Sequence, residues 1–164
     1  MRNRAEQAKT KTRFIKKELL SRTMRIVLVS QEPDIRAPSA KAFLEEVKHH
    51  SSKDTIACAH LIHKEFELTE KEKITLATLG ITSFDQDSTP LTKADLTASR
   101  VIAMDQLTRE SIQESFGILV PLYNEIAKNR SEDVEKAKEN DQIISTLHYL
   151  QETAPHLLKN INLF

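Results

Sequence analysis

The fold is decided by the stretch MRIVLVSQEPDIRAPSAKAFLEEV, residues 24–47. Residues 26–29 form a short apolar run that is mostly β-branched, the pattern of a strand buried on both faces. A tight loop follows, and a helix begins near Pro38, since proline suits the first turn of a helix. One face of that helix is apolar and carries Ala40, Phe43, Leu44 and Val47. The stretch therefore predicts a strand, a loop and a helix in succession.

The loop lies where many α/β proteins bind a phosphate. Backbone N–H groups between a strand end and a helix start point at a common anion, and Arg36 would close a fork on it. The loop nevertheless contains neither glycine nor cysteine. The candidate anion-binding residues are Ser30, Gln31, Glu32, Asp34, Ile35 and Arg36.

The remaining chain predicts an alternating series of helices and strands. Thr69 and Glu72 form a capping box, and Gly80 and Gly117 are placed to end helices. Ser131 is expected to open the longest helix, with Glu132 and Asp133 favourable in its first turn. The expected elements are helices over 5–22, 69–80, 106–117 and 131–153, a short helix after the loop at 89–92, strands over 55–59, 100–105 and 118–122, and a final helical piece over 156–161.

Strands that alternate with helices of this length imply an α/β fold with a four-stranded parallel sheet and helices on both faces. We expect the strand over 24–29 to be central and the helix over 131–153 to pack against the sheet. Ligands of such sheets bind at the carboxyl ends of the strands, where the loop after Val29 lies. The chain divides into a basic, helical N-terminal extension over 1–23 and one domain over 24–164.

Composition fits a soluble globular protein: of 164 residues, 39% are hydrophobic and 29% are charged, and the apolar runs are too short to span a membrane. The single cysteine, Cys58, excludes an intramolecular disulfide and favours a reducing compartment, so we expect a cytoplasmic protein. His60 and His63 lie close to it, but no second ligand pair follows at a spacing that metal sites use. We therefore expect no metal or other cofactor, read these histidines as surface or helix-start residues, and read Cys58 as buried.

A net charge of zero conceals an asymmetry. Residues 1–25 carry nine Lys and Arg against Glu6 and Glu18, a balance of +7, so the rest of the chain carries −7. Such a segment suits nucleic acid, an anionic membrane or an acidic partner. A solvated helical extension is the other reading, favoured by the near absence of aromatic residues on which bases would stack.

Three stretches resemble the low-molecular-weight protein tyrosine phosphatases, a family that includes arsenate reductases and bacterial arginine phosphatases. VLVSQEPDIRAPSAKAFL is similar to the family's V-C-x-G-N-x-C-R-S-P-x-A-E signature, TPLTKADLTASRVIAMD to the segment that ends in A-M-D, and EKITLATLGI to the helix before it. The resemblance covers about residues 24–153. It implies the family's α/β fold.

The resemblance also places the family's functional residues. Arg36 falls on the phosphate-binding arginine, and Ser30 falls on the nucleophilic cysteine. The family's general acid, an Asp followed by Pro, has no counterpart in VPLYNEIAKNRS, where Glu125 is the only carboxylate. Other departures are Glu32, Pro33, Ile35 and Ala37, which replace glycine, asparagine, cysteine and serine. An engineered exchange of cysteine for serine at position 30 would explain only one of them. Asp105 belongs to the A-M-D motif and is read as a positioning residue.

These departures remove what the family's reaction requires, a low-pKa nucleophile followed by hydrolysis of a phosphocysteine. We expect a degenerate member without turnover, an interaction or weak anion-binding module that contacts a phosphorylated or acidic protein through Arg36. The alternatives are a slow phosphatase of the same fold, and a nucleic-acid or membrane adaptor that uses the basic extension. Within the loop, we expect Glu32 to fold inward and pair with Arg36 in place of phosphate.

Overall fold

Four parallel strands form one sheet in the order β3-β2-β1-β4. The computed structural model describes residues 23–136 and 140–163. β1 pairs with β2 from Arg25 opposite Thr55 to Ser30 opposite His60, and with β4 on its other side, so the strand expected to be central is central. The strands are β1 (Arg25–Ser30), β2 (Thr55–His60), β3 (Thr89–Pro90) and β4 (Arg100–Ala103).

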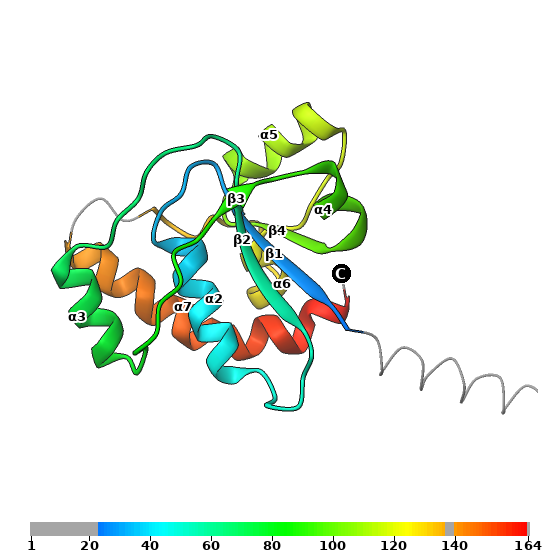
Figure 1. Cartoon of the computed structure of the whole chain (residues 1–164). Coiled ribbons are helices and arrows are strands. Elements are labelled where there is room, and N and C mark those ends of the chain that lie inside the picture. The colour runs from blue at the N-terminus through cyan, green and yellow to red at the C-terminus, as the bar shows by residue number, and fades with distance from the viewer. Residues whose placement is uncertain (1–22, 137–139, 164) are drawn as a thin grey trace, which may run out of the picture.

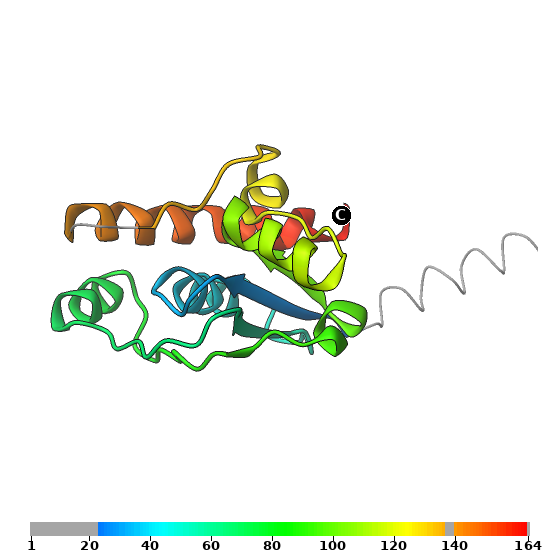
Figure 2. The same cartoon turned by 90° about the horizontal axis from the view of Figure 1, so that it is seen from above.

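Helices cover both faces of this sheet, which confirms the predicted fold class. Figure 1 shows α5 on one side of the strands and α2 with α7 on the other, and Figure 2 shows the same layers from above. The helices are α2 (Arg36–Val47), α3 (Glu70–Thr78), α4 (Lys93–Ala98), α5 (Gln106–Phe116), α6 (Tyr123–Lys128), α7 (Asn140–Asn160) and the short 3₁₀ helix η1 (Ile161–Leu163).

Alternation along β1 separates two cores. Ile26 and Leu28 point to the face that packs against Phe43 of α2 and Leu147 of α7, whereas Val27 and Val29 point to the face that packs against Ile112 of α5. Full burial of a side chain of this size contributes about 1.5–3 kcal/mol. The apolar run over 26–29 is therefore buried on both sides, as its composition predicts.

The predicted helix signals at α3 and α5 are confirmed. Thr69 accepts from the backbone N–H of Glu72, and the Glu72 carboxylate accepts from that of Thr69, so the capping box is complete. Gly117 follows α5 with a left-handed φ of 69°, a conformation that suits glycine.

The fourth strand was predicted in the wrong place. Residues 118–122 form only a single bridge, between Ala103 and Leu122, and Thr89–Pro90 is the fourth strand instead. Pro121 has no N–H for a strand ladder, and the N–H of Leu122 donates to the Glu125 carboxylate at 2.8 Å. That contact begins α6, a helix of six residues that the sequence did not predict.

The longest helix does not begin at Ser131. Residues 131–136 are not helical, α7 starts at Asn140, and it continues through Pro155 to Asn160, joining the two helical pieces that were predicted separately. The expected cap residues have other partners: Ser131 donates to Glu125 Oε2, and Asp133 Oδ1 accepts from the N–H of Gln106. α7 packs on the sheet through the shared core, as expected.

The predicted helix over 5–22 lies outside the described residues, and the boundary of the N-terminal extension stays a prediction. Within the described part of the chain, no helix is long and apolar enough to cross a membrane.

Candidate functional site

The loop between β1 and α2 lies at the carboxyl edge of the sheet. Ser30 ends β1, with 1% of its surface exposed, and Arg36 begins α2 with 3% exposed. Asp34 Oδ1 accepts from the backbone N–H of Arg36 at 2.9 Å, which satisfies one of the free donors at the start of the helix. Ile35 turns into the core beneath. The loop thus enters the helix through the Asp34 side chain.

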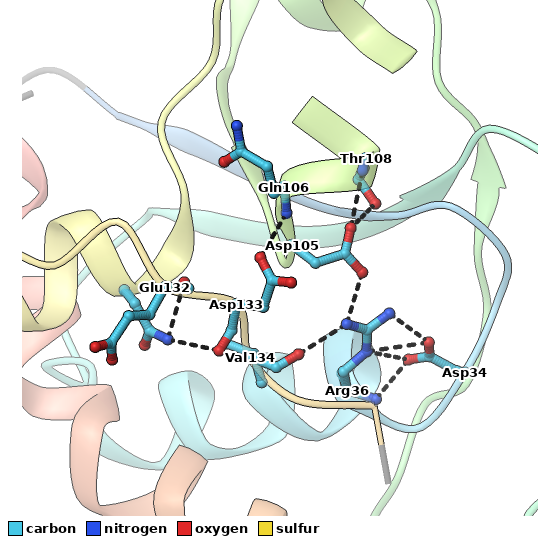
Figure 3. A network of polar contacts seen from close by, with 9 residues as sticks. Asp34, Arg36, Asp105, Gln106, Thr108, Glu132, Asp133 and Val134 are labelled. Atoms are coloured by element: carbon cyan, nitrogen blue, oxygen red, sulfur yellow. Dashed lines mark hydrogen bonds and ion pairs between the residues drawn. The ribbon is translucent and has the colours of Figure 1, made fainter. Parts of the chain in front are cut away.

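Arg36 is held by three groups from different parts of the chain (Figure 3). Its Nη2 donates to Asp34 Oδ2 at 2.8 Å, and its Nε donates to the same carboxylate at 3.1 and 3.2 Å. Its Nη1 donates to Asp105 Oδ2 at 2.7 Å and to the backbone oxygen of Val134 at 2.8 Å. A guanidinium has five N–H donors, and the partners just described use four of them.

Asp105 is positioned by the helix that follows it. It is the N-cap of α5, and its Oδ1 accepts from the N–H and the hydroxyl of Thr108 at 2.8 and 2.6 Å. Burial alone would raise the pKa of Asp105, but the hydrogen bonds from Thr108 and the charge of Arg36 lower it. Burial likewise opposes the charge of Arg36, yet Asp34 and Asp105 raise its pKa. Both groups are therefore charged at neutral pH.

The expectation that Glu32 pairs with Arg36 is wrong. Glu32 Oε2 lies 3.6 Å from Lys64 Nζ, in the loop after β2. Asp34 is placed to pair with the guanidinium because its Oδ1 already accepts a hydrogen bond from the first N–H of α2. A carboxylate of the chain does stand in front of the guanidinium, as expected, but a different one.

Ser30 and Gln31, the first two candidate residues, end in buried oxygen atoms without hydrogen-bond partners. Ser30 is the register partner of His60 on β2, so both side chains point to the same face of the sheet. His60 Nδ1 lies 2.8 Å from Ser88 Oγ, while its Nε2 is buried without a partner. Burial and then the neighbouring His63 lower the pKa of His60, so its imidazole is neutral at pH 7.

Sequence reasoning missed this histidine, which was read as a surface or helix-start residue and is 3% exposed. The position of His60 at the end of the strand over 55–59 could have revealed it, because the carboxyl ends of adjacent parallel strands meet at one edge of the sheet.

A cavity of about 910 Å³ opens beside Arg36 and is bordered by the segment 131–136. Its charged lining residues are four carboxylates and two cations: Asp105, Glu132, Asp133, Glu135, Arg36 and Lys136. Since Asp34 also neutralises Arg36 from the loop, negative charge prevails at this edge, and the electrostatic field disfavours an anion.

Two carboxylates lie where a counterpart of the family's general acid could be sought. Sequence analysis considered Glu125 and missed Asp133. Glu125 is structural: its Oε1 accepts from Arg109 Nη1 at 2.6 Å and from the N–H of Leu122. Asp133 was expected inside a helix, but it lies in the loop that borders the cavity, so this loop does contain an aspartate. It is followed by Val134, not by proline.

The cysteine and histidines form no metal centre in the described ranges, where no group of three metal-ligating side chains occurs. Cys58 is 4% exposed, as expected for a buried residue, and burial raises the pKa of its thiol to about 12. His63 is exposed, which agrees with its reading as a surface residue.

Comparison with solved structures identifies the fold. The chain superposes on a mutant of YwlE from Bacillus subtilis with a TM-score of 0.74 and 21% identity, covering 85% of this chain and 99% of that one. A mutant YwlE arginine phosphatase with a phosphorylated active site serine gives 0.71 and 21%, covering 85% and 96%. A low-molecular-weight protein tyrosine phosphatase from T. tengcongensis gives 0.70 and 18%, covering 84% and 99%.

No family model and no curated protein matches the sequence. The chain therefore has the fold of the low-molecular-weight protein tyrosine phosphatases, at a sequence identity that shows the fold alone.

Proposed function

We propose that this chain is a phosphatase-fold protein without phosphatase turnover, which acts through protein interactions. The observation that carries the proposal is the pairing of Asp34 with Arg36. The Asp34 carboxylate accepts from the guanidinium and from the first N–H of α2, the two kinds of donor that would bind a phosphate. The chain thus supplies its own anion, and a substrate phosphate must displace it.

The chemistry at position 30 supports the same conclusion. The family's reaction uses a thiolate, and the ordinary pKa of a cysteine near 8.5 can be lowered by several units in such a site. A serine hydroxyl needs a hydrogen-bonded base instead. Ser30 Oγ has no hydrogen-bond partner, and His60, its register partner on β2, is not bonded to it. Neither nucleophile nor phosphate site is then ready for phosphoryl transfer.

The experiment compares anion binding and turnover in matched variants. Calorimetric titration with phosphate and phosphotyrosine should give no binding at millimolar concentration in the natural chain, and no hydrolysis of an aryl phosphate. Asp34→Ala should gain phosphate binding, because Arg36 and the N-terminus of α2 are then open. Asp85→Ala is the control: it removes the same charge from an exposed pair with Lys41 and should gain nothing.

The proposal fails if the natural chain turns over substrate and Arg36→Met abolishes that activity. It also fails if phosphate binds the natural chain as tightly as it binds Asp34→Ala, because Asp34 would then not occupy the site. A thermal melt of each variant confirms that it is folded before its titration is interpreted.

One observation favours a second candidate, a slow phosphatase that uses Ser30. His60 is neutral, buried and the register partner of Ser30, so a hydrogen bond between the two side chains would make a nucleophile and its base. The YwlE mutant described above carries a phosphorylated active site serine, which is a precedent in that protein for a serine that carries the phosphoryl group. The slow phosphatase predicts a low rate of turnover that both Ser30→Ala and His60→Gln abolish. The protein without phosphatase activity predicts no turnover in the natural chain or in either variant.

The expected contact of a phosphorylated or acidic partner with Arg36 remains a proposal, and the carboxylates around the cavity weigh against it. The nucleic-acid or membrane role of residues 1–25 also stays a prediction, since it rests on sequence charge alone.

A further inference from the structure

A second cavity, of about 530 Å³, borders the segment 131–136 but does not reach Arg36. It is enclosed by α6, this segment and the first half of α7, and none of the residues 30–36 lines it. Its size lies within the range of about 300–1,000 Å³ that small-ligand sites occupy. It adjoins the cavity beside Arg36 but contains none of the loop after β1; the two cavities share the lining residues Glu132, Asp133, Val134, Glu135 and Gln142.

One of the residues that line this cavity, Tyr149, has an aromatic ring that already contacts an ammonium group. Lys128 Nζ lies 4.6 Å from the centroid of the Tyr149 ring, within the cation–π range of about 6 Å. The Tyr149 hydroxyl donates to Asn124 Oδ1. Asn124 is 2% exposed and donates in turn to the backbone oxygens of Glu132 and Asp133, at 3.1 and 3.0 Å. The ring is thus fixed, and its face accommodates a cation.

Carboxylates line the same cavity as this ring. Glu132, Asp133 and Glu135 line the cavity against one cation, Lys128, so the lining carries −3 and +1, a net −2. Glu132 and Glu135 are exposed and form no ion pair within residues 23–136 and 140–163. Figure 3 shows Asp133 and Val134 between Glu132 and Arg36. Within the described residues, two carboxylates without an ion-pair partner therefore line the same cavity as the Tyr149 ring.

We propose that this cavity binds the guanidinium or ammonium group of a basic peptide segment. The incoming cation takes the place of Lys128 Nζ on the Tyr149 ring, and Glu132 and Glu135 are its counter-ions. Lys128 is exposed, so its side chain can turn into solvent without unfolding α6. The partner chemistry is opposite to the acidic partner expected for Arg36, and it does not depend on whether Ser30 is catalytic.

The test uses a cation and its neutral isostere. N-acetyl-arginine amide and N-acetyl-citrulline amide are titrated by calorimetry or by amide NMR shifts into the full chain at low salt. Arginine should bind and citrulline should bind at least about tenfold more weakly, because only the guanidinium has a charge for the ring and the carboxylates. Lys128→Met should tighten arginine binding about two- to fivefold by removing the internal competitor.

Two further variants make the result specific. The double variant Glu132→Gln/Glu135→Gln should weaken arginine binding. If the double variant has a lower melting temperature than the natural chain, the single variant Glu135→Gln replaces it in the titration. Lys71→Met removes the same charge from exposed α3, outside the cavity, and should leave the affinity unchanged. Equal affinity for arginine and citrulline would overturn the proposal, as would a Lys128→Met variant that binds no more tightly than Lys71→Met.

Discussion

Arg36 Nη1 lies 2.7 Å from Asp105 Oδ2, although the two residues are 69 positions apart in the chain. The contact joins the start of α2 to the start of α5, so it fixes two helices on opposite faces of the sheet. With Asp34 on its other edge, Arg36 is a buried cation between two carboxylates. Removing one member of such a group leaves the others as uncompensated buried charge.

Arg36→Met should therefore destabilise the fold by about 3–5 kcal/mol. Urea unfolding measures the loss. Arg25→Met is the matched control, because Arg25 pairs with Asp95 in an exposed position, where such pairs contribute about 0–1 kcal/mol. A loss at Arg36 no larger than that at Arg25 would show that the buried network contributes little to stability.

Ser30→Cys alone should restore almost no hydrolysis of p-nitrophenyl phosphate. The thiol would be present, but Asp34 would still occupy Arg36. Combining Ser30→Cys with Asp34→Ala should give more turnover than either change alone, because nucleophile and anion site are then both available. Substantial turnover from the single Ser30→Cys variant would show that Asp34 is no barrier to phosphate.

His60 should make the protein less stable as pH falls below about 6.5. Its pKa is lowered in the folded state by burial and then by His63, whereas the unfolded chain titrates near 6.5. The unfolded state thus binds the proton more readily, so the contribution is complete above pH 6.5 and is lost as pH falls toward the folded pKa. His60→Gln should flatten this part of the curve of unfolding free energy against pH.

The matched control for that experiment is His156→Gln, at an exposed position of α7, which should leave the slope as it is. An unchanged slope in His60→Gln would place the pH dependence elsewhere.

Cys58 should resist thiol reagents in the native protein. The thiol is buried, and its pKa is raised to about 12, so almost no thiolate is present at pH 8. Ellman's reagent should label one thiol per chain in guanidinium chloride and react far more slowly without it, because the chain has a single cysteine. Rapid labelling of the native protein would mean that the strand opens readily.

Local sequence signals identified much of this fold. The apolar run over 26–29, the capping box at Thr69 and the glycine after α5 each depend on residues close together in the chain, and each is confirmed. The errors arose where side chains have distant partners. Ser131 and Asp133 have the composition of a helix start, but they bind Glu125 and the N–H of Gln106 instead.

The candidate site divides in the same way. Arg36 and the position of the loop follow from sequence, because a strand, a loop and a helix are contiguous. The choice of Asp34 over Glu32 depends on which carboxylate meets the first N–H of α2. The approach of Asp105 and His60 depends on how separate strands end at one edge of the sheet, and that of Val134 depends on the course of the segment 131–136; spacing along the chain reveals neither.

The single bridge between Ala103 and Leu122 also disfavours association of this sheet edge with the sheet of another copy of the chain. β4 is the last strand of the sheet, and an open strand edge is a template for association with another chain. The N–H of Ala103 donates to the carbonyl of Pro121 at 3.0 Å, so the segment that covers this edge includes a residue with no N–H of its own. By failing to become a strand, residues 118–122 cover the edge of β4 without offering a regular new one, which limits aggregation through the sheet.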